Sequence, residues 1–162
     1  GSFSCFGNIT GPDDDNLDDL YLKDGDGILG IAYNAVIENA IGGSNEDTIV
    51  GNSAANTLYG GAGAGVKDTL TGNGGADIFV CSLSDASTDL SVADIIFGFT
   101  NSSDKIGLED RTFSDLTISN ASGPYSGKTQ IVDTNSSKVL FLLDGIDASL
   151  IDETDFVVTD FV

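Results

Sequence analysis

The 162-residue sequence contains no histidine and no tryptophan. Without histidine, the chain carries neither a Ser-His-Asp nor a Cys-His catalytic site, and it has no HExxH zinc motif. Cysteine is scarce as well. Cys5 and Cys81 lie far apart, which excludes a CxxC metal or redox motif and leaves two alternatives, a disulfide or two separate thiols. These absences predict that this chain is not an enzyme by itself.

Basic residues and long apolar runs are also few. The sequence has 6 Lys and Arg against 26 Asp and Glu, a net charge of −20, and its basic residues do not cluster. This balance argues against nucleic acid and anionic membranes as partners. The longest aliphatic and aromatic run, residues 139–143, is too short to insert across a bilayer. Because so many like charges oppose compaction, a folded chain of this composition is expected to bind cations.

A nine-residue repeat occupies residues 42–80 in four copies: GGSNEDTIV, GNSAANTLY, GGAGAGVKDTLT and GNGGADIFV. They fit G-G-x-G-x-D-x-U-x, where U is a large apolar residue, which is the calcium-binding repeat of RTX proteins. Position six holds Asp47, Asn56, Asp68 and Asp77, and position eight holds Ile49, Leu58, Leu70 and Phe79. The third copy carries three extra residues, 65–67, in its turn. A flexible linker would not keep this phase between glycine, acid and apolar residue.

The repeat predicts the fold. Six turn residues, with glycines that permit a positive φ, precede a three-residue strand whose one apolar side chain points inward. Two repeats then form one coil, with Ile49 stacked on Leu70 in one sheet and Leu58 on Phe79 in the other. The predicted fold class is all-β, a right-handed parallel β-roll capped by flanking β-strands.

The acids at position six are expected to stack along the turns. Stacked carboxylates and turn carbonyls form an oxygen-only cage, which suits calcium rather than zinc or copper. One more half-coil upstream puts Glu38 at position six, so the stacks predicted are Glu38 on Asn56, Asp47 on Asp68, and Asn56 on Asp77. Because two coils bury little apolar surface, folding is expected to be coupled to calcium binding and to apolar caps.

The repeat divides one structural domain into three parts: an N-terminal flank and start of the roll (1–41), the RTX β-roll (42–80) and a C-terminal β cap (81–162). The acidic runs 13–15 and 18–19 are interpreted as a solvated loop. The flanks are predicted to hold β structure at 28–37, strands at 95–99, 116–118, 129–132 and 139–143, a hairpin turn at 133–138, and one helical turn within 147–151.

Segments outside the repeat resemble the serralysin-type zinc metalloproteases. The stretch IENAIGGS (37–44), with 30–32 and 51–56, is similar to the start of their β-roll. Segments 75–80, 82–85, 94–99 and 104–108 resemble the end of it. The resemblance covers nearly the whole chain, and IENAIGGS is its most specific part. The family usually has Asp where Gly98 and Gly107 stand, and it rarely carries cysteine.

The resemblance implies a set of calcium ligands. Side-chain ligands or near-ligands are expected at Glu38, Asp47, Asn56, Asp68 and Asp77. Residues expected to line the cages, mostly through carbonyls, are Val36, Gly43, Asn45, Asn52, Ala54, Gly60, Gly61, Gly63, Gly72 and Gly75. Flanking sites would be completed by Asp85, Asp94 and Asp104. The insertion at 65–67 either leaves its site intact, distorts it or removes it.

The resemblance also implies a type I secretion signal in the C-terminal part, where an acid precedes apolar residues at 155–158 and again at 160–162. The alternative for this segment is an ordinary edge strand.

The function predicted is a calcium-binding, non-catalytic C-terminal domain of a secreted, extracellular bacterial metalloprotease. It would drive calcium-dependent folding and type I secretion. Its partners would be calcium ions, the secretion machinery and an upstream catalytic domain that holds the zinc. Two alternatives stay open. A glycan-binding RTX module of a polysaccharide-modifying enzyme is disfavoured by the few basic residues. A module of a surface adhesin would carry longer repeat arrays.

Overall fold

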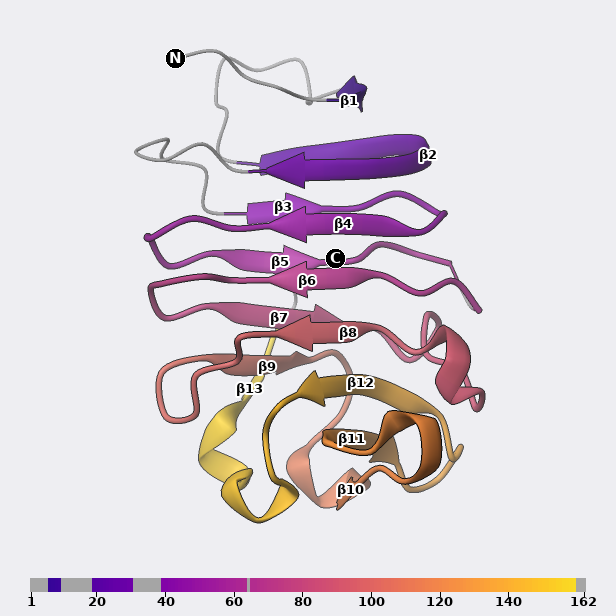
Figure 1. Ribbon diagram of the computed structural model, residues 1–162, viewed down its shortest axis with the longest axis vertical. Coiled ribbons are helices and arrows are strands. Elements are labelled where there is room, and N and C mark those ends of the chain that lie inside the picture. The colour runs from indigo at the N-terminus through magenta and orange to yellow at the C-terminus, as the bar shows by residue number, and fades with distance from the viewer. Residues whose placement is uncertain (1–5, 10–18, 31–38, 64, 160–162) are drawn as a thin grey trace.

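The computed structural model describes residues 6–9, 19–30, 39–63 and 65–159, and these are organised as β-strands with five short 3₁₀ turns (Figure 1). The strands of the roll are β2 (Asp19–Gly30), β3 (Asn39–Ile41), β4 (Asp47–Val50), β5 (Thr57–Tyr59), β6 (Thr69–Thr71), β7 (Ile78–Cys81), β8 (Ile95–Phe97) and β9 (Lys105–Leu108). The remaining strands are β1 (Phe6–Ile9), β10 (Leu116–Asn120), β11 (Lys128–Asp133), β12 (Val139–Asp144) and β13 (Phe156–Val158). The 3₁₀ turns are η1 (Leu90–Val92), η2 (Phe113–Asp115), η3 (Gly123–Tyr125), η4 (Ala148–Leu150) and η5 (Glu153–Asp155).

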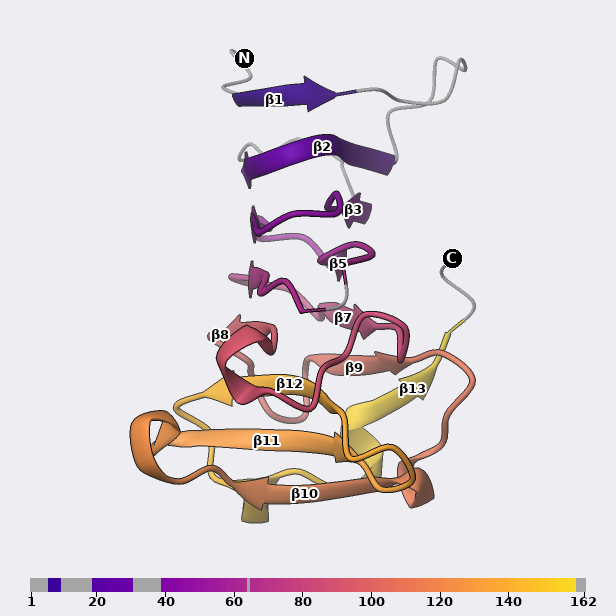
Figure 2. The same ribbon diagram turned by 90° about the vertical axis from the view of Figure 1, so that its right-hand side faces the viewer.

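Successive strands of the roll alternate between two parallel sheets, which Figure 2 shows as two facing stacks. The front sheet, nearer the viewer in Figure 1, runs β2-β4-β6-β8-β12, and the back sheet runs β2-β3-β5-β7-β9-β13. The long strand β2 serves both sheets, because residues 19–21 pair with β3 and residues 27–30 pair with β4. This alternation is the coiling of a parallel β-roll, and it confirms the predicted fold class.

The core of the roll is two ladders of apolar side chains at position eight of the repeat. The front ladder pairs Ile49 with Leu70 and Leu70 with Ile96. The back ladder pairs Leu58 with Phe79, and Phe79 with the next strand. All five of these side chains are fully buried. The register is the one that the nine-residue phase predicts. A shift of one residue in the pairing would turn the apolar side chains of each ladder toward solvent.

A three-stranded antiparallel cap closes the lower end of the roll. Strands β10, β11 and β12 pair in sequence, with residues 133–138 as the hairpin turn that was predicted, and β12 joins β8 in parallel. Every residue of 139–143 is buried, so this apolar run is the centre of the cap. The predicted helical turn within 147–151 is η4.

Some expectations for the flanks were wrong or incomplete. Asp19, assigned to an acidic loop, is the first residue of β2, and β8 ends at Phe97 rather than at residue 99. Strand β9 was not predicted. The run 156–158 forms β13, an edge strand parallel to β9. Cys81 is a free, buried thiol, while Cys5 lies outside the described residues.

Candidate metal centre

The turns of the roll lie along two edges. On the first edge, turn residues 42–46, 60–63 with 65–67, and 82–93 lead into strands of the front sheet. On the second edge, turn residues 51–55, 72–76 and 98–103 lead into the back sheet. The residue at the start of each strand or just before it is buried: Asp47, Asp68 and Asp94 on the first edge, and Asn56, Asp77 and Asp104 on the second. Asp94 and Asp104 therefore extend the stacks that the repeat predicts by one residue each.

Each stack is tied to the main chain of the coil before it. On the first edge, the Asp47 N–H donates to Asp68 Oδ1 and the Asp68 N–H donates to Asp94 Oδ1, both at 2.8 Å. On the second edge, the Asn56 N–H donates to Asp77 Oδ1 at 2.8 Å, and the Asp77 N–H donates to Asp104 Oδ1 at 3.1 Å. One oxygen of each acceptor is thus fixed in the stack, and the other faces its own turn.

The first glycine of each repeat makes room for that second oxygen. A Cβ added to Gly60 would lie 2.3 Å from Asp68 Oδ2, and one added to Gly72 would lie 2.1 Å from Asp77 Oδ2. Neither glycine has a positive φ. These first glycines are needed for close approach of the acid, and the positive φ expected of the glycine pairs occurs at another position. A positive φ of 108° occurs at the second glycine of a pair, Gly61.

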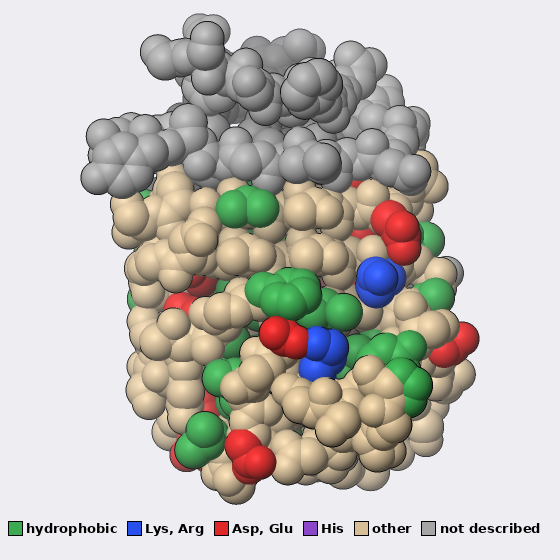
Figure 3. Space-filling model, in the orientation of Figure 1, with side chains coloured by type: hydrophobic (Ala, Val, Ile, Leu, Met, Phe, Trp, Pro, Cys, Tyr) green, Lys and Arg blue, Asp and Glu red, His purple; other side chains and the backbone are tan. Residues whose placement is uncertain are grey.

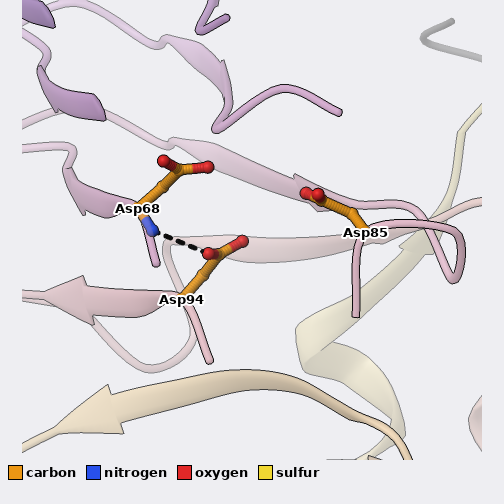
Figure 4. A group of neighbouring side chains, drawn as sticks. All are labelled: Asp68, Asp85 and Asp94. Carbon is orange, nitrogen blue, oxygen red and sulfur yellow. Dashed lines mark hydrogen bonds between the residues drawn. The ribbon is translucent and has the colours of Figure 1, made fainter. Parts of the chain in front are cut away.

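Three carboxylates converge on the first edge. Asp68, Asp85 and Asp94 each present an oxygen within 4.8 Å of the other two, and all three residues are buried (Figure 4). Asp85 comes from the long turn between β7 and β8, and its Oδ1 accepts from the Gly63 N–H at 2.6 Å. Oxygens that share one calcium ion at 2.3–2.6 Å lie at most about 5 Å apart. The spacing of the three acids fits one such ion.

Burial makes the charged state of these three carboxylates unfavourable. Burial raises the pKa of Asp94 to about 8, of Asp68 to about 7 and of Asp85 to about 6. Hydrogen bonds from main-chain N–H groups oppose these shifts, while the neighbouring acids add to those of Asp68 and Asp94. The three groups must therefore either hold protons near neutral pH or be neutralised by a cation.

On the second edge, Asp77 is also a buried acid whose charge is unfavourable without a proton or a cation. It is 1% exposed, and burial raises its pKa to about 6. Within the described part of the chain, Asp77 Oδ2 and Asp85 Oδ2 are buried oxygens with no hydrogen-bond partner. A buried carboxylate oxygen without a donor is costly, so both atoms fit the role of cation ligands.

The turns that hold the expected carbonyl ligands also stack. A Cβ on Gly61 would lie 2.1 Å from the Gly43 carbonyl, and one on Gly75 would lie 2.4 Å from the Ala54 carbonyl. Asn52 is buried, and its Oδ1 accepts from the Ala54 N–H at 2.7 Å. Asn45 is exposed, and no described contact brings it to the acids. Val36 and Glu38 lie outside the described residues.

The insertion leaves the strand register intact. Val66 N–H donates to the Gly63 carbonyl at 2.8 Å, and β6 still pairs in register with β4. The Gly63 N–H, just before the insertion, donates to Asp85 Oδ1. One acid was missed: Glu109 Oε1 is buried without a hydrogen-bond partner in the described chain, and its charge helps raise the pKa of Tyr59. No motif in the sequence marks it.

Comparison with known families decides the classification. Residues 6–162 match the family described as Peptidase M10 serralysin C terminal. The chain belongs to this family. The match spans the roll and the cap together, so the serralysin C-terminal fold extends over the described residues.

A solved structure supports the same fold. The solution structure of the AlgE6R3 subunit from the Azotobacter vinelandii mannuronan C5-epimerase is similar to this chain, with a TM-score of 0.55 and 24% sequence identity. The similarity covers 97% of this serralysin-type chain and 86% of the epimerase subunit. A search of curated proteins found no match. Among the described residues, no helix is long and apolar enough to cross a membrane.

Proposed function

We propose that this chain is a calcium-binding module whose roll folds when calcium enters the two turn edges. The convergence of Asp68, Asp85 and Asp94 carries the proposal. Three buried acids with raised pKa values, together with carbonyls from stacked turns, are an oxygen-only ligand set. Such a set favours a hard, flexible-coordination cation such as Ca²⁺. Asp47, Asn56, Asp77 and Asp104 would contribute along the rest of both edges. The ion would neutralise the stacked acids and fix turns that otherwise bury little apolar surface.

The proposed context is the accessory, non-catalytic part of a secreted bacterial metalloprotease. The family match over residues 6–162 supports this context. The chain has no histidine, so a catalytic zinc site of the HExxH kind would have to lie in an upstream domain. An HExxH motif encoded upstream of Gly1 would support the protease context. An epimerase domain encoded upstream of Gly1 would instead favour the glycan-related alternative. The similarity to the AlgE6R3 subunit is a similarity of fold, and it supports that alternative only to this extent.

The direct test is folding as a function of cation. In chelator at neutral pH, far-ultraviolet circular dichroism should show loss of most β structure, and calcium should restore it. Magnesium should restore it poorly, because Mg²⁺ demands a near-ideal octahedral site. A spectrum that does not change on chelation would contradict the proposal. The same preparation should not hydrolyse casein.

Export can be tested separately from folding. Asp155 is 1% exposed and Phe156–Val158 pairs with β9, so deleting this segment would damage the fold as well as a signal. Val158 is 64% exposed, so Val158→Asp changes the motif with little effect on the core. If a type I exporter reads the motif, Val158→Asp should lower export while calcium-induced folding is kept. Normal export of this variant would indicate that the segment is only an edge strand.

A further inference from the structure

The fourth repeat contains the only Asn-Gly pair in the sequence, Asn73-Gly74. Asn73 is exposed at the second edge and has a positive φ of 71°. Its Nδ2 donates to the Gly51 carbonyl at 2.8 Å, and the Gly74 N–H donates to the Asn52 carbonyl at 3.1 Å. Both groups of the pair are therefore hydrogen-bonded to the preceding coil.

The chemistry of this pair is intramolecular. Glycine has no Cβ, so its main-chain nitrogen can approach the side chain of the residue before it. The Gly74 nitrogen, after losing its proton to solvent, bonds to Cγ of Asn73, the Cγ–Nδ2 bond breaks, and Nδ2 leaves as ammonia. Water then opens the five-membered succinimide at one of its two carbonyls, which gives aspartate or isoaspartate. Solvent supplies every reactant of this sequence.

We propose that Asn73 is a site of spontaneous deamidation in the unfolded roll, and that folding of the second edge protects it. Attack on Cγ requires the Asn73 and Gly74 hydrogen bonds to the preceding coil to be broken together. The reaction in the folded protein is then limited to the population of opened molecules. Control of this opening by calcium rests on the proposed function. The reactivity of Asn73 in the unfolded chain is independent of that proposal.

The products would impair the second edge. An aspartate at position 73 replaces an N–H donor with a carboxylate oxygen facing the Gly51 carbonyl. An isoaspartate adds a carbon to the main chain four residues before Asp77. A chain kept without calcium would therefore age into a form that needs more calcium to fold.

The chain offers two controls. Asn52 has the equivalent place in the second repeat, but it is 7% exposed and is followed by Ser53, whose Cβ hinders the attack. The substitution Gly74→Ala adds the same hindrance at the reactive pair. Its Cβ would meet only the Ser53 Cα, at 3.8 Å, so the variant should keep the fold.

The test is to incubate the full chain at mildly alkaline pH with calcium, with chelator, or in urea, and to follow amide-to-acid conversion at residues 73 and 52 by peptide mass spectrometry. In urea, Asn73 should react fastest. We expect a rate at least about tenfold lower with calcium, and a similar loss for Gly74→Ala in urea. Equal rates in calcium and in urea, or Asn52 reacting as fast as Asn73 in urea, would overturn the inference. If the chelator sample is protected like the calcium sample while the urea sample reacts, the Asn73 site stands and calcium-coupled folding fails.

Discussion

The roll and the cap bury acidic side chains in opposite ways. In the cap, Asp133 is fully buried, and it accepts from Ser136 Oγ at 2.6 Å, the Ser136 N–H at 2.7 Å and Arg111 Nε at 3.1 Å. These donors hold the pKa of Asp133 below its usual value. In the roll, Asp94 is 7% exposed and burial raises its pKa to about 8. Desolvation is the largest cause of the shift at Asp94, whereas at Asp133 the hydrogen bonds from Ser136 outweigh it.

Ion pairs are distributed unevenly between the two regions. In the part of the chain that the structure describes, the ion pairs are Arg111–Asp133 and Lys128–Asp144, and both lie in the cap. The stacked acids of the roll accept from main-chain N–H groups instead. On the front face, acidic side chains are scattered rather than gathered in one patch (Figure 3). The cap thus contains donors for its buried acid, whereas Asp77 Oδ2 and Asp85 Oδ2 in the roll have no donor among the described residues.

The largest expected effect comes from removing an acid of the cluster. Asp94→Ala takes away one of three converging carboxylates, so fewer calcium ions should bind at saturation, and the calcium midpoint of folding should rise by about tenfold or more. The matched change in the cap, Asp133→Ala, removes the acceptor of the Arg111 and Ser136 hydrogen bonds and should cost about 1–3 kcal/mol. It should not change the number of ions bound. Equilibrium dialysis combined with circular dichroism measures both quantities.

The comparison fails if both variants bind as many ions as the parent chain, or if Asp133→Ala loses an ion. The midpoint alone does not distinguish the two variants, because any loss of folded-state stability raises the calcium needed for coupled folding. The ion count does distinguish them.

A smaller difference is expected within the roll. Asp47 and Asp68 place two carboxylates on the first edge, whereas Asn56 and Asp77 place an amide and a carboxylate on the second. Calcium is attracted more strongly by two charges than by one. Asp47→Ala should therefore raise the calcium midpoint roughly threefold more than Asn56→Ala does. If Asn56→Ala is the more damaging change, the turn with the 65–67 insertion holds no ion.

The pH dependence should also separate the two regions. For Asp68, Asp77, Asp85 and Asp94, the folded-state pKa lies above the usual value, so the folded roll binds more protons than the unfolded chain. Stability in chelator should then fall as pH rises from about 4 to about 8. Asp133 acts in the opposite sense, since its lowered pKa adds stability that is lost as pH falls below its usual value.

Thermal melts near pH 5 and near pH 8, each with chelator and with calcium, test this dependence. These two pH values roughly bracket the range in which the protonation of the folded roll changes. With calcium present, the ion replaces the protons on these acids, so the thermal midpoint of unfolding should increase as pH rises. Stability that increases with pH in chelator would contradict the assignment of the roll's acids.

The smallest effect is expected on the surface of the cap. The side chains of Lys128 and Asp144 are 19% and 37% exposed, and the Lys128 ammonium lies 5.7 Å from the centre of the Phe97 ring. Lys128→Ala should cost less than about 1 kcal/mol in urea unfolding with calcium present. It should not alter the calcium requirement. A shift in ion count would mean that the cap also takes part in binding.

The sequence predicts the roll well because its phase is strict. The acid or amide at position six and the apolar residue at position eight keep one spacing in every copy, so the pairings of Ile49 with Leu70 and of Leu58 with Phe79 follow directly. Strand β9 has no such signal. It contains Gly107, which weakens a strand pattern, yet there the structure needs a small residue: a Cβ would lie 2.9 Å from Thr159 Cγ2.

The candidate site was predictable to a similar extent. Position six of each repeat gives Asp47, Asp68 and Asp77 directly. The other two members of the cluster, Asp85 and Asp94, lie beyond the repeat, so only the family resemblance pointed to them. The role of the first glycines became visible only in three dimensions, since it depends on how closely the acid oxygen approaches the turn.

Hydrogen–deuterium exchange tests the central claim most directly, because the amides of Asp47, Asn56, Asp68 and Asp77 donate within or along the stacks. Calcium should protect these amides, and chelator at neutral pH should speed their exchange by at least about a hundredfold. Amides of the cap strands, such as Ile131 in β11, should lose less protection. Roll amides that stay protected in chelator would contradict the account, because the buried acids would then be stable without a cation.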